Sequence, residues 1–244
     1  MIPKRNCSYF FKARNQGFQN REINTVRECN LEEVVRDIDK AARLLACDYR
    51  RTSGHILSED DLKCALYNKL SYFYSYPCPT LDNGISATAL HTEIPWYDEK
   101  DKLRWRPDLS IVDPRNLSIL HGIGAHRHRN GVSYNRLPSK GFEFSGRAVA
   151  VELKFVRTLK GISRRNISSF QKDIDKLDSL CSRYNNRDPE DPYIKGILIV
   201  FSKTGKGTEQ MRGFIDKNSA LKDIKIFFHH ADIVSVLPRG NQAR

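Results

Sequence analysis

Hydrophobic side chains recur at helical spacing in two stretches near the start of the chain. The first stretch opens after Asn30 and runs to about Cys47, with apolar positions at Leu31, Val34, Val35, Ile38, Ala42 and Leu45. The second opens at Ser58, and its apolar stripe is Leu62, Leu66, Leu70 and Phe73. Asp61 stands three residues after Ser58, which is the spacing of a capping box. Both stretches are therefore predicted to be amphipathic helices.

Alternating, β-branched or continuously apolar segments predict the strands that follow. The expected strands are residues 90–96, 105–112, 147–156, 193–201 and 224–229, and helices are expected at residues 167–181 and 208–221. A run of three strands is thus followed by alternating helices and strands. This order predicts an α/β fold in which helices flank a central mixed β-sheet.

The chain has 244 residues, a length that suits one principal domain with an appendage. Residues 1–54 are assigned to an N-terminal helical extension, and residues 55–244 are assigned to the main domain. A basic insertion at about residues 114–146 separates the second and third strands. This insertion has little periodicity, and connections of such length in a compact domain are usually functional or disordered.

The cellular location is inferred from segments that the sequence lacks. No apolar run approaches the roughly 20 residues that a membrane span requires. The basic first residues are not followed by the apolar segment of a signal peptide. The six cysteines form no CxxC pair and resemble neither a zinc finger nor a disulfide framework. We therefore expect a cytoplasmic protein with reduced thiols.

The third predicted strand carries two charges on one of its faces. Side chains alternate across a strand, so Glu152 and Lys154 project from the same face. The opposite face is wholly apolar and consists of Val149, Val151, Leu153 and Phe155. If the second and third strands are neighbours, Asp108 of the second strand lies close to Glu152. The sequence thus predicts two carboxylates and an ammonium group at one place on the sheet.

Two adjacent carboxylates on a sheet are costly unless a cation neutralises them. Mg²⁺ is a hard ion that binds one or two carboxylates together with phosphate oxygens and water. Such an ion lowers the pKa of bound water and stabilises charge on a phosphoryl oxygen. Lys154 beside it would orient the attacking water and offset charge in the transition state. The alternative is that Glu152 and Lys154 form an ordinary ion pair on an exposed strand face.

Pro107-Asp108 followed by Glu152-Leu153-Lys154 resembles the motif of the PD-(D/E)XK nuclease superfamily, which has the restriction-endonuclease-like fold. The core of that family has the order αβββαβ, and the elements expected between residues 58 and 201 have the same order. The resemblance implies that Asp108, Glu152 and the carbonyl of Leu153 bind Mg²⁺, with Mn²⁺ also accepted. It further implies that Lys154 is the catalytic lysine.

The same resemblance implies contributions from two helices. Many members of the family carry an acidic residue on the first core helix, and Glu59 shares the inward phase of Leu62 and Leu66. Some members place a lysine or glutamine on the helix after the lysine strand. Gln171 is the candidate there, ahead of Asp175 and Lys176. The connection from Asp108 to Glu152 departs from the family pattern because it is longer than a simple hairpin.

Most of the positive charge lies in one part of the chain. The net charge of the protein is +12, and the segment from Pro114 to Lys172 alone carries +10. A surplus of this kind favours a polyanionic partner. The residues expected to bind nucleic acid are Arg127, Arg129, Arg136, Lys140, Arg157, Lys160, Arg164 and Arg165. The alternative is a solvated basic loop without a partner.

The function expected from these features is that of a Mg²⁺-dependent endonuclease that hydrolyses phosphodiester bonds of DNA, in restriction or phage defence. Duplex DNA is favoured over single strands, and no membrane is involved. We expect a homodimer, because cutting both strands of a duplex commonly requires two active sites, or else a partner subunit. Two alternatives stay open: a non-catalytic or partner-activated subunit that binds nucleic acid, and an enzyme that cleaves RNA.

Overall fold

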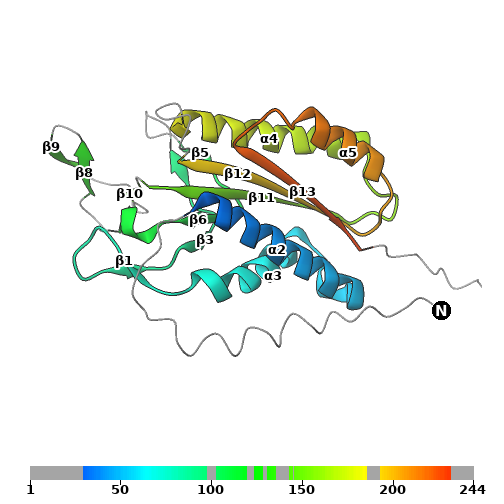
Figure 1. Cartoon of the computed structure of the whole chain (residues 1–244), viewed down its shortest axis with the longest axis horizontal. Coiled ribbons are helices and arrows are strands. Elements are labelled where there is room, and N and C mark those ends of the chain that lie inside the picture. The colour runs from blue at the N-terminus through cyan, green and yellow to red at the C-terminus, as the bar shows by residue number, and fades with distance from the viewer. Residues whose placement is uncertain are drawn as a thin grey trace, which may run out of the picture.

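The protein has an α/β architecture in which helices flank both faces of a central sheet (Figure 1). The computed structural model describes residues 30–97, 103–119, 124–128, 131–135, 143–144, 146–185 and 193–231. The prediction of a mixed central sheet flanked by helices is confirmed. Within the described residues, no helix is long and apolar enough to cross a membrane.

The central sheet has five strands in the order β13-β12-β11-β6-β3. These strands are β3 (Leu90–Thr92), β6 (Leu109–Val112), β11 (Ala148–Val156), β12 (Ile194–Ser202) and β13 (Ile224–His230). The pairs β11–β12 and β12–β13 are parallel, whereas β11–β6 and β6–β3 are antiparallel. Every residue of β12 is buried, because helices cover both of its faces.

Helices α2 (Leu31–Arg51) and α3 (Glu59–Tyr74) cover one face of the sheet, and α4 (Arg164–Asn185) and α5 (Thr208–Lys217) cover the other (Figure 1). The Asn30 side chain caps α2, and Ser58 and Asp61 form the expected capping box of α3. The apolar face of β11 packs with α2 and α3 in one hydrophobic core. Residues 31–51, assigned to an extension by the sequence, therefore belong to the layer that covers the sheet.

Two predicted strands are shorter than expected. The prediction of one strand at residues 90–96 is wrong, because β3 ends at Thr92 and a separate strand β4 (Trp96–Tyr97) follows Pro95. The prediction for residues 105–112 is wrong in the same way, because Pro107 separates β5 (Leu103–Trp105) from β6. Proline has no N–H to donate to a strand ladder. β4 and β5 instead pair with each other outside the central sheet.

Other element boundaries also differ from the predictions. α4 begins three residues earlier and ends four residues later than predicted, and α5 ends at Lys217 instead of residue 221. Short 3₁₀ turns lie at Ser53–His55 and Pro114–Asn116. The hairpin of β1 (Cys78–Pro79) and β2 (Ser86–Ala87) was not predicted. The insertion contains two strand pairs: β7 (Leu117–Ser118) with β10 (Glu143–Phe144), and β8 (Gly124–His128) with β9 (Gly131–Asn135).

Two loops are joined at the end of the sheet where β11 and β12 terminate. One loop leads from β11 to α4 and the other from β12 to α5. The Ile162 N–H donates to the Lys206 carbonyl at 3.0 Å. Gly161 and Gly207 have φ values of 77° and 86°, and a Cβ on Gly207 would lie 2.7 Å from the Ile162 carbonyl oxygen. Only glycine allows the two backbones to approach so closely.

Gly161→Ala is expected to destabilise the protein by about 2–3 kcal/mol, since the new Cβ meets the Lys206 carbonyl and the residue has a left-handed backbone. Gly213→Ala is the matched control. Gly213 lies inside α5 with no atom near the position of a Cβ, so alanine there is expected to be neutral or stabilising by up to about 1 kcal/mol. Urea unfolding of both variants measures the difference. Equal stability of the two variants would contradict a tight junction between the loops.

Candidate active site

The candidate site lies where β11 extends beyond its neighbour β6. β6 pairs with residues 148–151 of β11 only, whereas β12 pairs with β11 along its whole length. Beyond Val151, the N–H groups that point toward β6 have no strand partner. Two carboxylates accept them: Asp108 Oδ2 lies 2.8 Å from the Leu153 N, and Glu59 Oε2 lies 3.1 Å from the Phe155 N. Carboxylates therefore take the place of the missing strand.

Each carboxylate comes from a place fixed by local structure. Asp108 follows Pro107 and immediately precedes β6, so it lies at the point where strand pairing begins. Glu59 is the first residue of α3, beside the capping box that starts the helix. The N–H and C=O of one strand residue point to the same side. The carbonyl of Leu153 therefore lies on the same open edge as its N–H, next to Asp108.

Lys154 lies between carboxylates from both helical layers. Its Nζ is 3.3 Å from Glu59 Oε1 on α3 and 3.5 Å from Asp173 Oδ2 on α4. Asp173 also binds Lys176, with 3.0 Å between its Oδ1 and the Lys176 Nζ. The site thus combines four carboxylates with two ammonium groups. Five of the six predicted catalytic and metal-binding residues meet here, namely Asp108, Glu152, Leu153, Lys154 and Glu59.

Gln171 is not brought into this group. Its Nε2 lies 2.9 Å from Asp175 Oδ1 and 3.3 Å from Asn218 Oδ1, so it faces α5. Two residues along a helix correspond to a rotation of about 200°. Asp173 consequently points toward β11, whereas Gln171 points toward α5. Sequence reasoning missed Asp173. The available signal was its place among the apolar positions that α4 buries, between Phe170 and Leu177.

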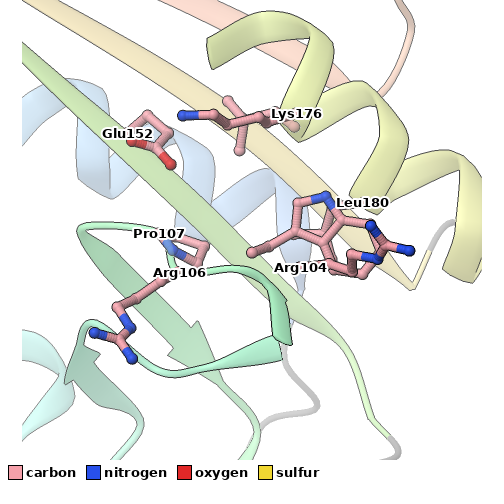
Figure 2. A pocket seen from close by; sticks show the side chains of 8 residues that line it. Arg104, Arg106, Pro107, Glu152, Lys176 and Leu180 are labelled. Carbon is pink, nitrogen blue, oxygen red and sulfur yellow. The ribbon is translucent and has the colours of Figure 1, made fainter. Parts of the chain in front are cut away.

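A small pocket opens beside Glu152. It has a volume of about 190 Å³ and is lined by Arg104, Trp105, Arg106, Pro107, Glu152, Lys176, Leu177 and Leu180. Figure 2 shows Lys176 of α4 extending toward Glu152 of β11, with Pro107 on the loop that precedes β6. The carboxylate of Glu152 therefore borders a space that is open to a ligand, and Lys176 lines the same pocket.

Burial and charge change the pKa values at this site. Burial, followed by the carboxylates of Asp108 and Asp173, raises the pKa of Glu152 to about 7. Burial also raises the pKa of Asp108, although the hydrogen bond from Leu153 opposes the rise. For Lys154, burial favours the neutral amine, but the surrounding carboxylates outweigh it and the pKa is raised. Lys154 is therefore a cation at neutral pH.

The residues present fit a divalent cation. Within the described chain, Glu152 makes no hydrogen bond or ion pair of its own, and a half-buried carboxylate in that state is costly. Asp108, Glu152 and the Leu153 carbonyl offer the hard oxygen ligands that Mg²⁺ prefers. No three His, Cys, Asp or Glu side chains of the described residues gather as a metal site. Any ion here would therefore rest on two carboxylates and a backbone oxygen.

Four of the expected nucleic-acid contacts are exposed near this site. Arg157 and Lys160 lie on the loop after β11, and Arg164 and Arg165 form the first turn of α4. The adjoining loop after β12 adds Lys206, which is also exposed. Arg127 belongs to β8, with its side chain outside the described part. Arg129, Arg136 and Lys140 lie outside the described residues.

Glu152→Gln is expected to stabilise the metal-free protein at alkaline pH. Because the folded-state pKa is raised, the wild type incurs a cost that grows as the pH rises from about 4.5 to about 7 and is constant above that. The variant should exceed the wild type by about 2 kcal/mol in unfolding free energy at pH 8, and by less than about 1 kcal/mol at pH 5. Denaturant unfolding in EDTA measures both values.

Glu209→Gln is the matched control for this measurement, because Glu209 is an exposed acid on α5. It should show no comparable gain at either pH. If the Glu152→Gln protein is no more stable than the wild type at pH 8, burial and the acidic neighbours do not raise the pKa of Glu152.

Neither a protein-family model, nor a curated protein, nor a solved structure matches this chain.

Proposed function

We propose that this protein is a metal-dependent nuclease of the PD-(D/E)XK type, which hydrolyses phosphodiester bonds of DNA. The observation that carries the proposal is the convergence of Asp108, Glu152 and Lys154 at the open edge of β11. The order α3, β3, β6, β11, α4, β12 supports it, because this is the αβββαβ order of the restriction-endonuclease-like core. An ordinary ion pair on a strand face does not account for the site, since Glu152 and Lys154 are not paired with each other.

Asp108, Glu152 and the carbonyl of Leu153 would hold Mg²⁺. The bound ion would supply an acidified water and a positive charge beside the scissile phosphate. Glu152 must lose its proton to take part, and its pKa of about 7 makes that step sensitive to pH near neutrality. Asp108 is fixed for this role by the hydrogen bond from Leu153.

Lys154 would act as a cation and not as a base, because the surrounding carboxylates raise its pKa. An ammonium group has three N–H donors and no acceptor. It is therefore suited to orient an attacking water and to stabilise the negative charge that develops on the phosphate. Glu59 limits the freedom of this side chain from the α3 side, at 3.3 Å from the Nζ.

The substrate backbone would be held by the two joined loops at the ends of β11 and β12. Arg157, Lys160, Arg164 and Arg165 lie on the first loop and the start of α4, and Lys203 and Lys206 lie on the second. No acidic residue occurs in residues 157–172 or 202–208. Charge of one sign on a largely exposed surface suits contact with phosphates, which supply most of the sequence-independent affinity for DNA.

Cleavage is expected to require a divalent ion and both halves of the motif. With Mg²⁺ or Mn²⁺, the wild type should cut duplex DNA, and EDTA should stop it. Lys154→Ala and Asp108→Asn should each lower the rate by about 10²- to 10³-fold, because each removes a group that acts on the transition state. Lys217→Ala, which removes an exposed lysine of α5, should cut at the wild-type rate.

The assay uses linear and circular duplex DNA, single-stranded DNA and RNA side by side. Cutting that persists in EDTA and in both motif variants would refute the assigned site. Tight binding without cleavage under any metal would identify a non-catalytic subunit instead, and cleavage of RNA alone would replace the proposed substrate.

Lys160→Ala/Lys206→Ala is expected to weaken DNA binding about 10-fold and to lower the slope of log affinity against log salt by about 2, since each residue contacts a phosphate. Binding is measured in a Lys154→Ala background and in EDTA, so that the DNA stays intact. Lys40→Ala/Lys222→Ala is the control, because it removes two exposed lysines remote from the joined loops. Identical affinities and salt slopes for the two double variants would exclude the loops from the interface.

A further inference from the structure

Asp173 is a charged residue inside the buried stripe of α4. Its neighbours in that stripe are Phe170, Ile174 and Leu177, all of which pack on the sheet. The Asp173 side chain is only 7% exposed. A carboxylate in such surroundings is costly unless cations compensate for it. Its place in the fold therefore calls for an explanation beyond packing.

The two oxygens of Asp173 face different lysines. Oδ1 accepts a hydrogen bond from the Lys176 Nζ at 3.0 Å. Oδ2 is buried and has no hydrogen-bond partner among the described residues, and the nearest cation is the Lys154 Nζ at 3.5 Å. Asp173 is thus shared between one lysine of its own helix and one lysine of β11.

This sharing leaves Glu152 without an ion pair. Glu152 lies on the same face of β11 as Lys154 and across from Lys176, and both lysines favour its charged form from a distance. A lysine side chain is long and flexible, so either ammonium group is able to move toward the nearest carboxylate. Asp173 and Glu59 are the carboxylates that hold Lys154 in the structure.

We propose that Asp173 is a positioning residue that draws Lys154 and Lys176 away from Glu152, so that Glu152 stays free to bind a divalent cation. This inference rests on the proposed nuclease function. Without Asp173, both ammonium groups compete with the metal for Glu152, and Lys154 is no longer held on the α4 side. Loss of Asp173 then lowers both the affinity for metal and the rate of the chemical step.

Asp173→Asn tests this, with Asp175→Asn as the matched control. Asp175 is an exposed carboxylate of the same helix that binds Gln171, so its variant removes the same charge away from β11. Calorimetry without DNA measures Mn²⁺ affinity, and cleavage at saturating metal gives kcat and KM. For Asp173→Asn we expect Mn²⁺ binding and kcat each to fall about 10-fold or more, with KM for DNA within about twofold of the wild type. Asp175→Asn should match the wild type in all three.

The outcomes separate the two ideas. The nuclease site stands if Lys154→Ala cuts far more slowly than the wild type and the wild-type protein binds Mn²⁺. If Asp173→Asn then behaves as Asp175→Asn does, the role of Asp173 alone is refuted. If Lys154→Ala cuts at the wild-type rate, the nuclease site itself is refuted, and the role of Asp173 with it. Should Asp173→Asn fail to fold, Asp173→Ser gives the same comparison with a smaller, neutral side chain. A fall in stability alone, with metal affinity and kcat unchanged, would also refute the role.

Discussion

The length difference between two adjacent strands, β11 and β6, determines where the charged side chains of the candidate site gather. β11 continues past the start of β6, and each backbone N–H on the uncovered side must still find an acceptor. Asp108 and Glu59 meet that need for Leu153 and Phe155. The same two carboxylates are thereby anchored beside Glu152 and Lys154. A requirement of backbone hydrogen bonding thus assembles a group of charges that mutual repulsion would otherwise disperse.

The surroundings of the site have opposite effects on the charged forms of Glu152 and Lys154. Burial and repulsion disfavour the charged form of Glu152, while the acids around Lys154 favour its charged form. A protein optimised only for stability would replace such a group with apolar side chains. Such a group at the partly buried edge of a sheet is expected where the charges serve a ligand, and the raised pKa of Glu152 beside a pocket fits that view.

Much of this site follows from strand periodicity in the sequence. Alternation alone places Glu152 and Lys154 on one face, and the helical phase of Leu62 and Leu66 places Glu59 toward the sheet. The breaks at Pro95 and Pro107 were also readable, but the apolar pattern continues across them. The apolar positions of α4 place Asp173 on the buried side of that helix, but they do not show that this side lies against Lys154 of β11. Strand pairs of two residues, such as β7 and β10, are too short to have a period.

Lys154 contacts carboxylates from helices on both sides of the sheet. In the view of Figure 1, α3 lies below the sheet and provides Glu59, and α4 lies above it and provides Asp173. The surroundings of its ammonium group therefore depend on how α3, the sheet and α4 are aligned with one another. A small slide of either helix along the sheet would lengthen one contact and unbalance the other. The position of the Lys154 ammonium group accordingly depends on the packing of all three layers, and core substitutions far from the carboxylates would change its distances to Glu59 and Asp173.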